Sequence, residues 1–384
     1  MWKRMSLYGL LALTLVAPHC KKAYTPKLKQ ANNNYLVVGG IINTSSNGVT
    51  TIFLSRTVNL SDSNTNVPEY NATVTIEGKS GVKYLLTPAP GGAYNSDTLS
   101  LDNTDQYRLD ISTQDGDQFQ SDFVSCRQTP PIDSVSWQQE APPTQNVNLF
   151  VNTHDPMDSS RYYWWDYVET WEYQSPLTTI YGVQNDLIYL LDSSQQVHVC
   201  WMNHVSTDLL LATNIQLSQD VISQQPVLTI PHLDSRLYYR YSILVNQYTL
   251  TREAYQYWQT IKTNSQELGT LFDPQPSQLT GNVRSLKNPN EPVVGFVSAA
   301  RQQQMRIFID HSQLENWNFD PLGEAACSIK FIDQNASNYA IFNYPDTSYA
   351  PWYFVSNGTI FIAKRMCLNC TLMGGTNQQP SFWQ

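Results

Sequence analysis

Short runs of alternating apolar and polar residues, separated by turns, fill the first third of the chain. Within residues 71–76, Ala72, Val74 and Ile76 alternate with polar residues, so they share one face of a strand. A turn and a second strand follow, and turn signals recur about every eight to twelve residues, a spacing typical of immunoglobulin-like β-sandwiches. We therefore expect such a domain over residues 34–128.

Strand-like composition continues after a proline-rich boundary at residues 128–134. One segment, Thr251–Asn264, instead has helical spacing, with Thr251 in the N-cap position and Glu253 in the first turn. Asn357-Gly358 between two apolar runs predicts a tight hairpin near the end. The pattern thus predicts a mainly β protein, with a larger β-rich domain over residues 129–384 that contains about one α-helix.

The first nineteen residues have the pattern of an export signal. Lys3 and Arg4 precede the apolar run at residues 7–17, which is too short to span a bilayer as a helix. Cys20 follows directly, in the position where bacterial lipoproteins are cleaved and acylated. We expect a signal peptide over residues 1–19, lipidation at Cys20 and a tether over residues 20–33; a plain cleaved signal is the alternative.

Composition and cysteine content narrow the functional classes. The net charge of -9, with 14% charged residues, argues against nucleic-acid binding, which needs clustered Lys and Arg. Five cysteines remain after Cys20, an odd number that leaves at least one free thiol or one intermolecular bond. In an oxidising compartment we expect Cys327, Cys367 and Cys370 to form structural disulfides. We expect no bound metal and no other cofactor.

The segment RYYWWDYVETWEY, residues 161–173, is the most aromatic part of the chain. Read as a strand, it places Trp165, Tyr167, Glu169 and Trp171 on one face. Aromatic residues favour strands and bury well when their polar atoms find partners, so a core strand is the leading interpretation. The same four side chains are the candidates for a ligand platform that grips a sugar, and a protein-binding face is the third possibility.

Catalysis has little support in the sequence. Asp166, Glu169 and Glu172 lie on one segment, and this placement alone does not establish the paired carboxyl groups of a glycosidase. The sequence contains none of the motifs GxSxG, HExxH, GxGxxG or the P-loop. We therefore expect a non-enzymatic protein.

Several longer stretches resemble a family of Bacteroidota lipoproteins that is catalogued as a domain of unknown function. They include YLVVGGIIN, TPPIDSVSW, NTHDP, YSILVNQYTLTREAYQYW and the terminal CLNCTLMGGTNQQPSFW, and they run in order through nearly the whole mature chain. Members of this family are typically encoded beside TonB-dependent receptors. The resemblance therefore implies a lipid-anchored accessory protein of the outer membrane. Lys21 and Lys22 stand where an acidic surface-export run would stand, so the periplasmic and cell-surface faces both stay open.

Two functional hypotheses follow. The first is an accessory lipoprotein that docks on a TonB-dependent transporter and assists ligand capture or assembly. The second is a stand-alone glycan-binding lipoprotein. Exposure of Trp165 and Trp171 would favour the second hypothesis, and burial would favour the first.

Overall fold

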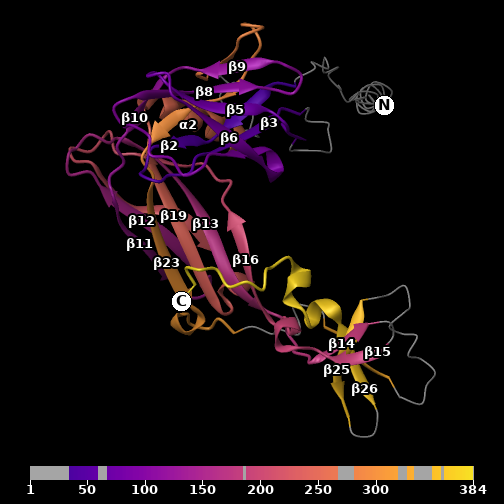
Figure 1. The fold of residues 1–384 in the computed structure, drawn as a ribbon. Coiled ribbons are helices and arrows are strands. Elements are labelled where there is room, and N and C mark those ends of the chain that lie inside the picture. The colour runs from indigo at the N-terminus through magenta and orange to yellow at the C-terminus, as the bar shows by residue number, and fades with distance from the viewer. Residues whose placement is uncertain are drawn as a thin grey trace, which may run out of the picture.

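A computed structural model describes residues 34–58, 67–184, 187–266, 281–318, 327–332, 348–355 and 359–383. The predicted signal peptide, the tether with Cys20 and the turn predicted at Asn357-Gly358 lie outside these residues. The described chain is mainly β, as the sequence predicts, and contains one α-helix, α2. Its strands form three units that follow one another along the length of the molecule, an N-terminal domain, a central domain and a small distal unit (Figure 1).

The N-terminal domain encloses the first hydrophobic core. The alternation predicted for residues 71–76 is confirmed, because Ala72, Val74 and Ile76 are all buried. The next strand begins at Lys83, so Val82 belongs to the exposed turn before it. The strands are β1 (Leu36–Gly39), β2 (Ile41–Asn43), β3 (Thr51–Arg56), β4 (Val67–Pro68), β5 (Thr73–Gly78), β6 (Lys83–Ala89), β7 (Ala93–Asn95), β8 (Gln106–Ser112), β9 (Gln118–Ser121) and β10 (Val124–Arg127).

A late segment of the chain returns to this domain. The short strand β20 (Val283–Ser285) pairs with β9, and β21 (Val294–Gly295) pairs with β1. The third short strand, β22 (Ser298–Ala300), pairs with both β2 and β10. Val283 and Val297 belong to the same core as β1 and β5. A single boundary after residue 128 therefore does not describe the domain. Strands of two or three residues are too short for an alternating pattern to reveal them.

The central domain contains two sheets that enclose the second core. One sheet has the order β11-β12-β18, and the other has the order β16-β13-β19-β23 with β17 beside β13. Since β13 lies between β16 and β19, the aromatic strand is a central one. The strands are β11 (Ile132–Gln139), β12 (Val147–His154), β13 (Tyr162–Gln174), β16 (Val199–Val205), β17 (Leu210–Thr213), β18 (Val221–Ile230), β19 (Arg240–Thr249) and β23 (Gln303–Asp310).

Helix α2 (Arg252–Gln266) lies at the junction between the first two units. The predicted N-cap is confirmed, because Thr251 Oγ1 accepts a hydrogen bond from the backbone N–H of Ala254 at 3.2 Å. Trp258 packs edge-on against Trp164 of the central domain, with ring centroids 4.9 Å apart. The neighbouring Tyr257 hydroxyl accepts a 2.6 Å hydrogen bond from the N–H of Gly295 in the N-terminal domain. The helix thereby contacts both domains.

The distal unit lies at the end of the molecule remote from the N-terminal domain (Figure 1). It combines the hairpin of β14 (Tyr181–Gln184) and β15 (Leu187–Leu190) with a sheet of order β24-β26-β25. These last strands span Ile329–Ile332, Ile360–Lys364 and Tyr349–Phe354, respectively. Sequence reasoning did not separate this unit from the central domain, because its strands come from two distant parts of the chain.

Candidate functional site

The residues predicted as a ligand platform lie in the core. Trp165 is 0% exposed and Tyr167 is 2% exposed, and both belong to the core between the two central sheets. The indole N–H of Trp165 donates to Gln247 Oε1 at 2.8 Å. Trp171 is partly buried against the same core. The platform interpretation is therefore corrected for Trp165 and Tyr167, since both rings pack between two sheets and offer no free face to a sugar.

Glu169 is also inaccessible, although it is ionisable. Its Oε1 accepts hydrogen bonds from Arg236 Nη1 at 2.6 Å and from the Tyr241 hydroxyl at 2.8 Å, and its Oε2 lies 2.9 Å from His204 Nδ1. Burial, followed by the nearby Glu169 carboxylate, raises the pKa of Tyr241 well above its ordinary value. A carboxylate that is 1% exposed and bonded on both oxygen atoms is a structural ion-pair partner.

The three carboxyl groups of the aromatic strand do not form a catalytic pair. Asp166 and Glu169 point to opposite faces of β13, as their odd spacing requires. Asp166 and Glu172 share a face but lie six residues apart, or about 20 Å along a strand, whereas glycosidase carboxyl pairs are separated by about 5 to 9.5 Å. Burial raises the pKa of Asp166 to about 6, and its partner is the Asn246 amide. This acid belongs to a polar row with Asn246 and Gln304, whose amide donates to Asn246 at 2.8 Å.

The predicted disulfide cysteines are all bonded, each to a distant partner. Cys327 pairs with Cys367, and Cys370 pairs with Cys200 on β16. Cys200 was not among the cysteines predicted to form disulfides. Cys126 is the free cysteine of the described chain, and burial raises the pKa of its thiol to about 11, which makes it a poor nucleophile. The two cysteines of the CLNC motif therefore cross-link the C-terminal segment to β16 and to the distal sheet.

An exposed aromatic row does exist, on the distal sheet. The strand register places Phe361 of β26 directly between Phe331 of β24 and Tyr353 of β25. Phe331 is 72% exposed and Tyr353 is 57% exposed, and the rings of Phe331 and Phe361 lie 6.4 Å apart. Ile329 extends the same face and is also exposed. We call these four residues the distal aromatic row.

The strands of the distal unit contain few charged residues. The five strands of the distal unit contain Lys330 and Lys364 and no acidic residue, whereas the whole chain has a net charge of -9. Lys330 lies over the Tyr349 ring, with its nitrogen 4.2 Å from the ring centroid, and thus stays near the sheet. By the strand register both lysines lie on the face opposite the row, which is therefore an apolar strip on a sheet anchored by Cys327–Cys367.

Sequence reasoning overlooked the distal aromatic row. The alternation in the segment Ile329–Ile332 spans only four residues, and the partner strands lie about twenty to thirty residues further on. These strands are too short to give a recognisable pattern, so their exposed rings were not predicted. The binding surface was predicted on β13 instead, which is longer and more aromatic. Only the strand register brings Phe331, Phe361 and Tyr353 together.

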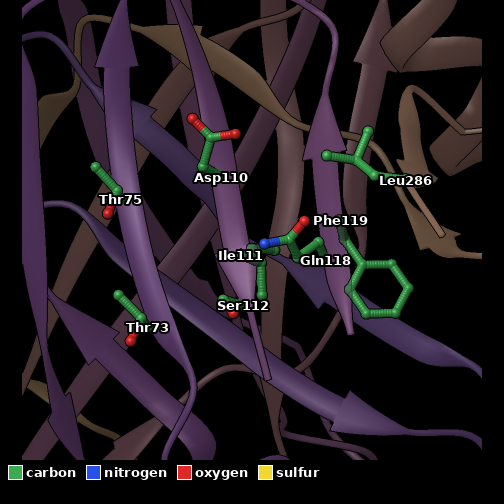
Figure 2. Close-up of a pocket in the computed structure, with 8 residues that line it drawn as sticks. All are labelled: Thr73, Thr75, Asp110, Ile111, Ser112, Gln118, Phe119 and Leu286. Carbon is green, nitrogen blue, oxygen red and sulfur yellow. The ribbon is translucent and has the colours of Figure 1, made fainter. Parts of the chain in front are cut away.

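A hollow on the N-terminal domain is a weaker candidate. Figure 2 shows Thr73 and Thr75 of β5, Asp110 of β8 and Leu286 around it. Its volume is about 190 Å³, below the roughly 300–1,000 Å³ of typical ligand pockets.

The described residues also contain no group of three or more His, Cys, Asp or Glu side chains suited to a metal ion. No helix among them is long and apolar enough to cross a membrane.

Fold and site together define a mainly β protein of three units, cross-linked by disulfides, with an exposed aromatic row at its distal end. The chain belongs to the family described as "Domain of unknown function (DUF4249)", whose model matches residues 21–306. No curated protein matches the chain.

Three solved structures are similar in part. A DUF4785 family protein from Legionella pneumophila has 8% identity and a TM-score of 0.17, over 55% of this chain and 52% of its own. A segment of two fibronectin type-III domains from chicken tenascin has 9% identity and a TM-score of 0.16, over 71% of this chain and 97% of its own. The Yersinia pseudotuberculosis adhesin InvE has 13% identity and a TM-score of 0.15, over 56% and 57%. The chain thus spans about half the length of the Legionella protein, and none of these likenesses defines a shared fold.

Proposed function

We propose that this protein is a non-enzymatic, lipid-anchored accessory protein of the outer membrane that docks on a TonB-dependent transporter. The distal aromatic row is the docking surface in this proposal. The observation that carries it is the exposure of Phe331 and Tyr353 on a sheet that a disulfide fixes in place. The resemblance to lipoproteins encoded beside TonB-dependent receptors supplies the class of partner.

A protein partner fits this surface better than a sugar does. Phe, Tyr and Trp are enriched at the centres of protein interfaces, where large rings displace water. The distal aromatic row is a mainly apolar strip across three neighbouring strands. Sugar sites instead need several polar groups that converge on the hydroxyls of the ring. The residues first considered for that task, Trp165 and Glu169, are buried.

The remaining units have supporting tasks in this proposal. Cys20 would carry the lipid, so the N-terminal domain would stand next to the membrane anchor as a spacer. Helix α2 contacts both larger domains and would hold their relative orientation. The distal sheet would then be presented to the transporter at a defined distance from the bilayer, on either face of the outer membrane.

The proposal is tested by paired substitutions and affinity capture from native membranes. The tip variant carries Phe331→Ala and Tyr353→Ala. The matched control carries Phe53→Ala and Tyr70→Ala, because these residues have the same types and are 51% and 54% exposed on the N-terminal domain. Gentle detergent extraction of the wild type should yield a barrel transporter in stoichiometric amount. The tip variant should lose this partner, and the control should retain it.

Two results would overturn the proposal. One is a wild-type lipoprotein that is extracted without a barrel partner, together with specific retention on a glycan matrix, which would favour the glycan-binding alternative. The other is equal capture of the transporter by the tip variant and the control. Both variants should have equal melting temperatures, because all four substituted side chains are exposed, and the comparison requires this equality.

A further inference from the structure

Two loops of the central domain enclose a buried polar cluster. The loop after β12 contains Asp155, and the segment between β17 and β18 contains Asn214 and Asp220. The backbone N–H of Asp155 donates to the carbonyl of Asp220 at 3.0 Å, and the N–H of Asn214 donates to the carbonyl of Arg161 at 3.3 Å. The two loops are therefore fixed against each other beside the start of β13.

Two oxygen atoms in this cluster lack a hydrogen-bond partner. Asp220 Oδ1 accepts from the Tyr163 hydroxyl at 2.9 Å and from the Asn214 amide. Asp220 Oδ2 and Asn214 Oδ1 accept from no donor among the described residues. Both side chains are 2% exposed, so bulk water does not solvate these atoms. A buried acceptor without a partner is costly, especially on a carboxylate.

The same cluster contains a second buried carboxylate. Asp155 accepts from the backbone N–H of Met157 at 2.9 Å and of Ser159 at 3.1 Å. Neither Asp155 nor Asp220 forms an ion pair with a Lys, Arg or His side chain in the described part of the chain. Two carboxylates thus lie close together in the protein interior, and no hydrogen-bonded Lys, Arg or His side chain among the described residues pairs with either of them. Buried charges in proteins are normally paired or bound to a metal ion.

We propose that a divalent cation with calcium-like chemistry binds between these loops, with Asp220 Oδ2 and Asn214 Oδ1 as ligands. Asp155 supplies the second negative charge. Carboxylate and amide oxygen atoms are the ligands that calcium prefers, and its irregular coordination suits a site built from two loops. The ion would satisfy both unpartnered oxygen atoms and balance both charges. Arg127 Nη2 donates to the carbonyl of Ser159 at 3.4 Å, so the ion would also brace the junction with the N-terminal domain.

Terbium luminescence offers a direct test, because the cluster contains its own sensitiser. The Tyr163 hydroxyl contacts Asp220, and the Trp165 ring stacks on Tyr163 with centroids 5.5 Å apart. Excitation of these rings in the full-length protein should produce terbium emission that calcium displaces. Asp220→Asn should abolish this emission. Asp115→Asn, in an exposed turn of the N-terminal domain, should leave it unchanged.

Thermal unfolding tests the same site without relying on a variant that loses the ligand. Saturating calcium should raise the Tm of the wild type by several degrees, and a chelator should reverse the shift. Asn214→Asp adds an anionic ligand, so it should lower the Tm in chelator and enlarge the calcium-dependent rise. A Tm that is insensitive to calcium, with no displaceable terbium emission, would overturn the proposal. That result would mean that the two oxygen atoms are satisfied by buried water or by a bound proton.

Discussion

Trp165 donates its indole N–H to the amide oxygen of Gln247 at 2.8 Å, and both side chains are completely buried. The amide nitrogen of Gln247 in turn donates to the carbonyl of Pro130 at 2.8 Å and to Thr153 Oγ1 at 3.0 Å. One glutamine therefore connects the aromatic strand, the β11-β12 sheet and the linker from the N-terminal domain. This network explains how an indole with a polar atom is accommodated in the hydrophobic core.

Replacing Gln247 by leucine should destabilise the protein strongly. The Gln247→Leu variant leaves the Trp165 N–H buried without an acceptor, which costs about 1–3 kcal/mol for each unpaired group. Urea denaturation would give the change in the free energy of unfolding. Gln138→Leu is the control, because Gln138 is exposed on β11 and its replacement should change stability by less than about 0.5 kcal/mol. Equal effects of the two substitutions would contradict the assigned role of Gln247.

Asp166 should make stability depend on pH in a defined direction. Burial raises its pKa from 3.8 to about 6, so between these values the folded state holds a proton that the unfolded chain has lost. The contribution of Asp166 to stability is therefore greatest below about pH 4, and it declines as pH rises through about 6.

The Asp166→Asn variant isolates this effect from other titrating groups. The variant should gain on the wild type by up to about 3 kcal/mol as pH rises from 4 to 7. Denaturation at a series of pH values measures the difference between the two proteins. A difference that stays constant over this range would show that Asp166 has an ordinary pKa in the folded state.

The disulfide Cys327–Cys367 should stabilise the distal unit more than it stabilises the rest of the chain. Replacing Cys327 and Cys367 by serine should loosen the distal sheet and leave the two larger domains folded, with a cost of about 2–5 kcal/mol to that unit. Hydrogen exchange would locate the loss of protection. Cys126→Ser, at the free thiol, is the control and should change little. Peptide mapping that links Cys367 to Cys370 instead would refute the connectivity.

Removal of the predicted lipid attachment site should release the protein from membranes. We expect Cys20→Ala to move the protein to the soluble fraction, because the anchor in this account is the acyl chain alone. Fractionation and immunoblotting would measure the shift. Membrane association that persists in the variant would contradict lipidation at Cys20 as the anchor.

Local patterns in the sequence sufficed for several elements of the fold. The alternation at Ala72, Val74 and Ile76 and the cap at Thr251 depend on neighbouring residues only, and both agree with the structure. The aromatic strand was also predicted as a strand, but its exposure depends on which sheet covers it. The second sheet, β11-β12-β18, covers the face that bears Trp165, and local patterns do not contain that information.

Pairings between distant segments were the part that the sequence did not reveal. Cys200 and Cys370 are 170 residues apart, and the β20–β22 region joins a domain whose other strands end at Arg127. The distal aromatic row likewise requires the register of β24, β26 and β25. A sequence carries such contacts only through side-chain types that fit many partners, so the candidate surface was found from the structure.

The central claim is that the distal aromatic row contacts a barrel transporter, and site-specific photo-cross-linking tests it most directly. A photoreactive phenylalanine analogue at Phe331 should cross-link to a barrel transporter in native membranes, whereas the same analogue at Phe53 should not. A cross-link from Phe53 alone, or no barrel adduct from either position, would contradict the account.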